Sequence, residues 1–270
     1  MKWSKQDIIN YYHQNEFGYK LWGPNFHFGY WDDGVKTQRQ ASLRFNEVMA
    51  KVAGITRDDH VLDAGCGVGG AAIFLAKTIG CKATGITITP RQVKLARQYA
   101  QRAGVGHLVD FHEMDYHNTT FADNSFSVVW GLESICYAEK QSFVKEAFRV
   151  LNDKGRLIIG DGFASREDYQ GKDAKLMQRW LDGWIVNSLK TPDNFKQYST
   201  NAGFRETAYL DVTQFVSKTS KLMFYVSLPF LPLHIIDKVV KIQYPTDALW
   251  NQYFAMKQKL WEYGIFLARK

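Results

Sequence analysis

The stretch Val61–Gly70, with the sequence VLDAGCGVGG, constrains the fold of this chain more than any other. Its glycines at 65, 67 and 70 have the G-x-G-x-x-G spacing of a sharp turn from a buried strand into a helix, where a ligand can approach the backbone closely. A short apolar run precedes the turn, and a helical run, AAIFLAKTI, follows it. The stretch therefore predicts the first strand–turn–helix unit of an α/β domain.

The same alternation continues along the chain and predicts further βα units. Strands are expected at 60–65, 82–88, 107–115, 125–133 and 155–163, and helices at 71–79, 90–104 and 140–151. Strands that alternate with helices in this way form a parallel, doubly wound sheet. Residues 59–163 are therefore expected to form one α/β core.

The regions on either side of this core are mostly helical in pattern. Helices are expected at 4–22 and 37–53 ahead of the core, and at 191–204 behind it. A strand is expected at 207–215, an apolar helical segment broken by Pro229 and Pro232 at 221–242, and a helix and a last strand in 249–270. The helical pieces are expected to lie as lids over the carboxyl ends of the strands, where open α/β sheets bind ligands.

Composition narrows the class of protein. The 270 residues are 46% hydrophobic, which is enough for a substantial core. No run reaches the roughly 18 to 20 apolar residues of a membrane span, and the first ten residues lack the apolar core of a secretion signal. We therefore expect a soluble, cytoplasmic protein, and leave open a peripheral membrane contact through the proline-containing segment 221–242.

Cysteines and charges exclude further classes. The three cysteines, Cys66, Cys81 and Cys136, have neither C-x-x-C spacing nor neighbouring histidines, so we expect no disulfide framework and no metal. The formal charge of +7 suits an anionic partner, but the Lys and Arg residues form no basic block. We therefore expect no nucleic-acid partner.

The carboxylate of Asp63 decides which ligand the glycine turn suits. A dinucleotide places its pyrophosphate at such a turn, and an aspartate there would face an anion. Asp63 suits a cationic ligand better, and S-adenosylmethionine carries both an ammonium group and a sulfonium. Thr87 at the end of the next strand, where NAD enzymes have an acidic residue, also argues against a dehydrogenase.

The motif VLDAGCGVGG resembles the first motif of class I S-adenosylmethionine-dependent methyltransferases, and residues 59–163 follow that family's order of elements. The resemblance implies a Rossmann-like, mostly parallel seven-stranded sheet with helical lids. It implies a lid at 1–55, a cofactor core at 56–163, substrate-capping insertions with strand six at 164–258 and the final strand at 259–270. It further implies that Asp63 holds the cofactor's amino group and that the glycines make room for its methionine part.

Other strings are similar to one subgroup of that family, which contains tocopherol, sterol, prenyl-diphosphate and natural-product methyltransferases and cyclopropane synthases. GITITPRQ implies that Thr87 and Gln92 bind the ribose, and HEMDYHN that Asp115 recognises adenine between Met114 and Tyr116. FHFGYW resembles a loop that closes over the cofactor. For Tyr30 and Trp31 in this loop, packing against the core and contact with the cofactor remain open alternatives. For His27, a hydrogen bond to the loop backbone alone is an alternative. The full set expected to bind the cofactor is Tyr30, Asp63, Gly65, Gly67, Gly69, Thr87, Ile88, Gln92, Met114, Asp115 and Leu132.

The string WGLESICYAEK holds the candidate catalytic residues. Glu133 leaves the carboxyl end of the central fourth strand, which points it toward the substrate, with Tyr137 nearby. The string resembles those of sterol and prenyl-diphosphate C-methyltransferases, which implies a base at Glu133; a helix cap or an ammonium ligand remains the alternative. Cys136 is expected to pack in the core.

We therefore expect methyl transfer to a small apolar or amphipathic metabolite, with an isoprenoid-like alkene carbon favoured as acceptor. The resulting carbocation would need aromatic faces and a base. Aromatic residues are frequent in the expected lids: Trp180, Trp184, Phe195, Tyr198, Phe224 and Tyr225. An O-, N- or aromatic C-methyltransferase of a quinol, tocopherol-like or other natural-product substrate is the alternative. Three alternatives from other classes of protein remain: a nucleic-acid methyltransferase, a dehydrogenase and an inactive binding protein.

Overall fold

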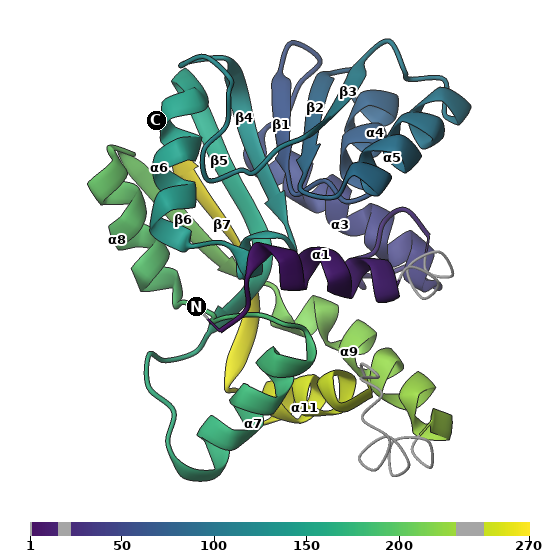
Figure 1. Ribbon diagram of the computed structural model, residues 1–270, viewed down its shortest axis with the longest axis vertical. Helices are drawn as coiled ribbons and strands as arrows, with labels where there is room; N and C mark the ends of the chain where they lie inside the picture. Colours follow the sequence, from purple (N-terminus) through teal and green to yellow (C-terminus); the bar gives the residue numbers. More distant parts are fainter. Residues whose placement is uncertain (1, 16–22, 231–245) are drawn as a thin grey trace.

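The sheet has seven strands in the order β3-β2-β1-β4-β5-β7-β6 (Figure 1). The computed structural model describes residues 2–15, 23–230 and 246–270. The strands are β1 (His60–Ala64), β2 (Lys82–Thr87), β3 (Val109–Glu113), β4 (Phe126–Leu132), β5 (Leu151–Ala164), β6 (Glu206–Asp211) and β7 (Trp261–Arg269). The first five strands are parallel, and β7 runs antiparallel between β5 and β6. The seven-stranded, mostly parallel sheet expected from the sequence is confirmed.

Helices cover both faces of the sheet (Figure 1). On one face lie α3 (Gln38–Ala53), α4 (Gly70–Thr78) and α5 (Pro90–Arg102), whose apolar side chains join a single core cluster. On the other lie α6 (Lys140–Val150) and α8 (Pro192–Ala202), which bury Phe143 and Phe195 in a second cluster. Burial of both faces explains why the central strands are almost wholly apolar.

Local signals set the ends of these helices. Thr37 and Thr191 cap α3 and α8 through reciprocal capping boxes, and Pro90 and Pro192 stand in first turns, where a missing N–H costs nothing. Gly54 and Gly203 end α3 and α8 in the left-handed conformation. The helix boundaries therefore follow from residues that the sequence displays.

The remaining helices gather at the carboxyl ends of the parallel strands. α7 (Gly171–Gly183) and α9 (Thr213–Ser227) pack against α11 (Thr246–Lys257), and short 3₁₀ turns span Ile135–Tyr137 and Leu228–Phe230. Figure 1 shows α1 (Lys5–Gln14) crossing between the sheet and this group. These elements enclose the edge of the sheet that carries the site.

One expected strand end differs in the structure, and two expected segments run into residues that the structure does not describe. The strand expected to reach residue 215 stops at Asp211, because the Asp211 carboxylate accepts the N–H of Thr213 and turns the chain into α9. The helix expected at 4–22 is described only as α1, since 16–22 lie outside the described residues. Of the segment 221–242, the last turns of α9 and the 3₁₀ turn are described, and 231–242, with Pro232, are not. No helix in the described part of the chain is long and apolar enough to span a membrane.

Candidate active site

A cavity of about 330 Å³ lies at the carboxyl ends of β1, β2 and β4. It is lined by residues from each motif that the sequence singled out. The predicted site residues among them are Asp63, Gly65, Gly67, Thr87, Ile88, Gln92, Met114, Asp115, Leu132, Glu133 and Tyr137. The cavity brings these side chains together because each follows the end of a strand in one parallel sheet.

The glycine turn is closed tightly against its neighbours. Gly65 has φ +86°, and a Cβ there would lie 2.4 Å from Ser134 Cβ. A Cβ on Gly70 would lie 2.2 Å from the carbonyl oxygen of Pro24 in the N-terminal loop. A side chain at either position would push the loop or the turn into the cavity, so the sequence needs glycine at both.

Gly69 has a structural role instead. It adopts φ +84° as the N-cap of α4, and a Cβ there would lie 2.7 Å from the ring of Phe111. Gly69 does not line the cavity. The structure therefore gives Gly69 a role in the packing of α4 on the sheet, while its expected contact with the cofactor stays a prediction.

Asp63 is buried beside the turn with one oxygen unpaired. It is 2% exposed, and its Oδ2 has no hydrogen-bond partner in the described chain. Burial raises the pKa of Asp63 to about 7, against a weaker opposing effect of the Ala72 N–H. An unpaired buried carboxyl oxygen is costly, so this atom is suited to a donor or cation on a ligand.

Two polar pairs mark the far end of the cavity. Thr87 Oγ1 donates a 2.7 Å hydrogen bond to Gln92 Oε1 at the end of β2. Asp115 lies 2.6 Å from His117 Nδ1 and 3.3 Å from Lys5 Nζ of α1. The bond from His117 and the charge of Lys5 hold the pKa of Asp115 well below its usual range, so Asp115 is an acceptor at neutral pH.

The aromatic residues after His27 point away from the cavity. Tyr30 stacks on Phe215 with ring centroids 4.4 Å apart, and the Trp31 indole donates to Thr219 Oγ1. Neither residue lines the cavity. The structure places Tyr30 outside the cavity lining, with its ring packed on α9, which begins earlier than the sequence predicted.

Glu133 has a strained backbone and a buried carboxyl group. Its φ is +48°, a left-handed conformation that non-glycine residues adopt rarely and mostly at functional sites. Its Oε1 accepts hydrogen bonds of 2.6 Å from the Phe28 N–H and the Tyr263 hydroxyl. Burial outweighs these bonds and raises the pKa of Glu133 to about 8. The helix cap that the sequence allowed for Glu133 is made instead by Glu139, on α6.

A second cavity of about 90 Å³ adjoins the first at Glu133. The side chains that line both are Tyr12, Phe26, His27, Glu133 and Tyr137. The second cavity has aromatic walls formed by Phe28, Trp180, Trp184, Trp261 and Tyr263. An apolar molecule here would lie against the carboxyl group of Glu133 and the edge of the first cavity.

The other aromatic residues of the expected lids have different surroundings. Phe195 and Tyr198 pack against the face of the sheet that α8 covers. Phe224 stacks on Tyr253 of α11, and Tyr225 is 53% exposed. Of the six, only Trp180 and Trp184 line the second cavity.

Two site residues were missed by the sequence analysis. Asp161 lines the second cavity and accepts the N–H groups of Cys136 and Gly162; burial raises the pKa of Asp161 to about 6. Its signal was visible, since it follows the apolar run of β5 as Asp63 follows that of β1. Tyr263 comes from antiparallel β7, whose register no sequence motif displays. Cys136, expected in the core, also lines the second cavity.

The described residues contain no group of three or more His, Cys, Asp or Glu side chains arranged to hold a metal ion. The arrangement offers a buried acceptor for a cation at Asp63 and a raised-pKa carboxyl group between the two cavities.

Comparison with known proteins gives a family match and several relatives. The model of the methyltransferase domain matches residues 62–159. The 27-O-demethylrifamycin SV methyltransferase of Amycolatopsis mediterranei is 34% identical over 197 residues, covering 73% of this chain and 72% of the relative. The 2-methyl-6-phytyl-1,4-hydroquinone methyltransferase of Synechocystis is 31% identical over 215 residues, covering 76% of this chain and 64% of the relative.

A solved structure matches nearly the whole fold. The structure of a geranyl diphosphate methyltransferase in complex with GPP and sinefungin has a TM-score of 0.80 and covers 98% of both chains. The sequence identity is 16%, so the likeness is one of fold.

Proposed function

The chain belongs to the S-adenosylmethionine-dependent methyltransferases that act on small molecules, and we propose that its acceptor is an apolar or amphipathic metabolite bound in the second cavity. S-adenosylmethionine is the cofactor. When bound, it supplies an activated methyl group on a sulfonium. The observation that carries the proposal is that Glu133 lines both the cavity with the cofactor motifs and the aromatic cavity beside it.

The residues of the first cavity fit this cofactor. The unpaired Oδ2 of Asp63 would accept a hydrogen bond from the ammonium group of the cofactor. The turn at Gly65, which has no room for a Cβ, would admit the methionine part of the cofactor. Thr87 and Gln92 would bind the ribose hydroxyls, and Asp115 the adenine amino group. An ammonium group beside Asp63 would favour its ionised form, which burial alone disfavours.

The residues that line both cavities would align the reactants. Methyl transfer is an in-line displacement, so most of the protein's contribution is orientation and exclusion of water. Phe26, Tyr12 and Tyr137 would exclude water at the junction. Within the expected lid regions 1–55 and 164–258, α1, α7, α9 and α11 would close the cavities, whereas α3 and α8 cover the sheet and β6 extends it.

Glu133 would serve as the base for an isoprenoid-like alkene acceptor. Methylation of an alkene carbon leaves a carbocation, whose charge the faces of Trp180, Trp184 and Trp261 would stabilise. The carboxylate of Glu133 would then take the proton that restores the double bond. A pKa of about 8 is well placed for a group that must hold a proton after each turnover and lose it again.

A second acceptor class is favoured by the named relatives. One is named for a demethylrifamycin and the other for a phytyl hydroquinone, and both are more than 30% identical to this chain. In a quinol or hydroxylated natural product, Glu133 would take the proton lost by the oxygen or ring carbon that attacks the methyl group. Tyr137, at the same junction, would orient the acceptor in either class.

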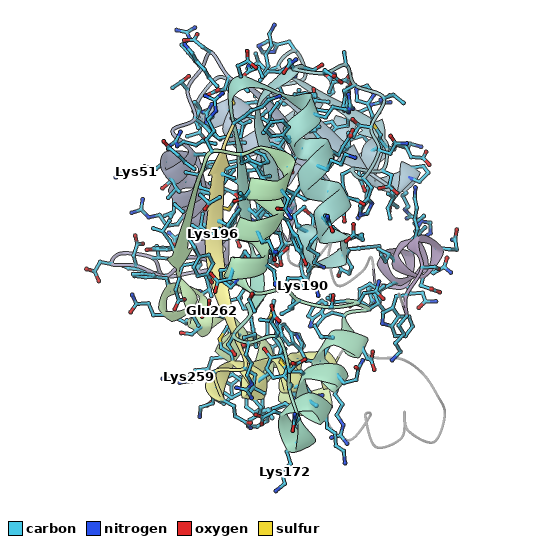
Figure 2. The ribbon with its side chains drawn as sticks, turned by 90° about the vertical axis from the view of Figure 1, so that its left-hand side faces the viewer. Lys51, Lys172, Lys190, Lys196, Lys259 and Glu262 are labelled. Atoms are coloured by element: carbon cyan, nitrogen blue, oxygen red, sulfur yellow. The ribbon has the colours of Figure 1, made fainter. Side chains whose placement is uncertain are left out.

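We expect no nucleic-acid partner, on electrostatic grounds. Figure 2 shows Lys51, Lys172, Lys196 and Lys259 on separate parts of the molecule. Dispersed lysines give no continuous basic track for a phosphate backbone. A peripheral membrane contact stays an expectation, supported by the exposed side chains of Tyr225, Val226 and Phe254 on α9 and α11.

The test is incubation with isotopically methyl-labelled S-adenosylmethionine and a metabolite extract, followed by mass spectrometry of labelled products. The proposal expects one labelled, largely apolar product. The Glu133→Gln variant separates the classes, because a carbocation without its base is trapped by water as a hydrated methyl adduct. A quinol acceptor gives only the normal product, more slowly. Label found in nucleic acid or protein and in no small molecule contradicts the proposal.

A further inference from the structure

Three buried polar atoms of the second cavity's side chains have no hydrogen-bond partner in the described parts of the chain. They are His27 Nε2, Gln252 Oε1 and Trp184 Nε1. His27 and Gln252 are each 6% exposed. Buried polar groups are almost always paired, and each exception needs an explanation. Three exceptions around one aromatic cavity indicate that a ligand supplies the partners.

The protonation of His27 follows from its surroundings. Its Nδ1 lies 2.7 Å from the carbonyl oxygen of Phe28, which can only accept, so Nδ1 carries the proton. Burial lowers the pKa of His27 to about 4, so the ring is neutral at pH 7 and Nε2 is a hydrogen-bond acceptor. Gln38 and Ser42 donate to the His27 carbonyl oxygen and hold the loop in place.

Gln252 and Trp184 complete the set on the lid side. The Trp261 indole donates a 3.1 Å hydrogen bond to the main-chain carbonyl oxygen of Gln252. This bond holds that part of α11 against the cavity wall. Side chains that line the cavity therefore carry two unpaired acceptors, His27 Nε2 and Gln252 Oε1, and one unpaired donor, Trp184 Nε1. A bare hydrocarbon would leave all three unpaired, whereas a hydroxyl group can donate to one and accept from another.

We infer that the acceptor molecule carries at least one hydroxyl group near its reacting atom, and that His27 and Gln252 recognise it by accepting its hydrogen bond. This rests on the proposed function, since it takes the second cavity as the acceptor site. His27 and Gln252 are then specificity-determining residues of the reaction. They select hydroxylated molecules, such as quinols or terpenoid alcohols, over hydrocarbons of the same shape, because an unmatched hydrocarbon leaves their acceptors desolvated and unpaired.

The test uses phenol and toluene, which differ by a hydroxyl in place of a methyl group. Each is titrated into the wild type, saturated with S-adenosylhomocysteine, while tryptophan fluorescence is followed; Trp180, Trp184 and Trp261 line the cavity. The variants are His27→Phe and Gln252→Leu, which remove one acceptor each. Ser199→Ala is the control, because Ser199 Oγ is also buried and unpaired but lies on α8, away from both cavities.

The inference expects the ratio of phenol to toluene affinity to fall about five- to tenfold in each cavity variant and to stay unchanged in the control. S-adenosylhomocysteine affinity should stay at the wild-type level in Gln252→Leu, because Gln252 lines only the second cavity. An unchanged ratio in both variants overturns the inference while leaving the cavity as a binding site. Loss of S-adenosylhomocysteine binding in His27→Phe with an unchanged ratio also overturns it, because His27 then serves the cofactor. If neither probe binds the wild type, the second cavity is not the acceptor site, and the proposed function fails with it.

Discussion

The Tyr263 hydroxyl donates a 2.6 Å hydrogen bond to Glu133 Oε1 and thereby ties the last strand of the sheet to the end of the fourth. β7 runs opposite to the parallel strands, so the start of this strand lies beside their carboxyl ends. The Tyr263 side chain is buried and that of Glu133 is partly buried, and an unpaired polar group of either would be costly there. Their pairing keeps a carboxyl group between the two cavities.

Replacement of Tyr263 by Phe tests this pairing. The hydroxyl lowers the pKa of Glu133 against the larger effect of burial, so its removal raises that pKa above about 8. If Glu133 is the base, the acidic limb of the pH–rate profile moves to higher pH and turnover at pH 7 falls several-fold. Turnover at pH 9 to 10 recovers much of the loss. If the acidic limb of the pH–rate profile does not move, a group other than Glu133 controls that limb.

Glu133 should also make stability depend on pH. Its pKa rises from 4.5 in the unfolded chain to about 8 in the folded one, so the protonated form is favoured by folding. Its stabilising effect is complete below pH 4.5 and is lost as pH rises to 8. Glu133→Gln, which keeps a neutral side chain, should therefore gain stability relative to wild type between pH 5 and pH 9, by about 2–5 kcal/mol at pH 9.

Urea unfolding of both proteins at pH 5 and pH 9 measures this gain. The difference between the two proteins isolates Glu133 from Asp63 and Asp161, whose pKa values burial also raises. A pH-independent difference would contradict the raised pKa.

The glycine turn gives a prediction with a matched control. Gly65→Ala places a Cβ 2.4 Å from Ser134 at φ +86°, so it should destabilise the fold and abolish S-adenosylhomocysteine binding in calorimetry. Gly80→Ala, at φ +83° with no atom within 4 Å, carries the backbone strain alone. The control should lose about 1–2 kcal/mol of stability and bind normally. Equal loss of binding in both variants would show that the turn's close packing is irrelevant to the cofactor.

A buried ion pair remote from the cavities should matter for stability alone. The Arg156 guanidinium donates to both oxygens of Asp59 at 2.8 Å and to the carbonyl oxygens of Ala53 and Gly54. Arg156→Ala should cost about 3–5 kcal/mol, because it leaves the Asp59 charge buried and unpaired. Arg166→Ala, which breaks an exposed pair with Asp173, should cost less than about 1 kcal/mol. Chemical denaturation of both variants measures the difference, and similar costs would contradict it.

The core of the fold was predictable because parallel strands are buried on both faces. The runs around Val61, Ile86 and Val129 are apolar for that reason, and glycines, prolines and threonines mark the turns and helix ends between them. That residues from Asp63 to Asp115 line one cavity was also predictable. Each follows a strand end, and parallel strands bring their ends to one edge.

The remaining contacts depend on tertiary packing that no local pattern displays. The stacking of Tyr30 on Phe215 requires the position of α9, which begins at Thr213 within the strand expected to reach 215. The bond between Tyr263 and Glu133 requires the antiparallel register of β7. The assignment of His27 Nε2 as an unpaired acceptor depends on the hydrogen bond between His27 Nδ1 and the carbonyl oxygen of Phe28. The sequence predicts many of the residues that line the first cavity, whereas tertiary packing decides which side chains line the second.

The central claim, that Glu133 is the base between cofactor and acceptor, is tested most directly by Glu133→Gln. Labelled product formed from methyl-labelled S-adenosylmethionine and a metabolite extract is measured for variant and wild type, and S-adenosylhomocysteine affinity is measured by calorimetry. The account predicts a loss of product formation of about 10²- to 10⁴-fold with nearly unchanged affinity, since glutamine keeps the size but not the basicity of the side chain. Product formation at the wild-type rate, or a collapse of S-adenosylhomocysteine affinity that accounts for the loss, would contradict it.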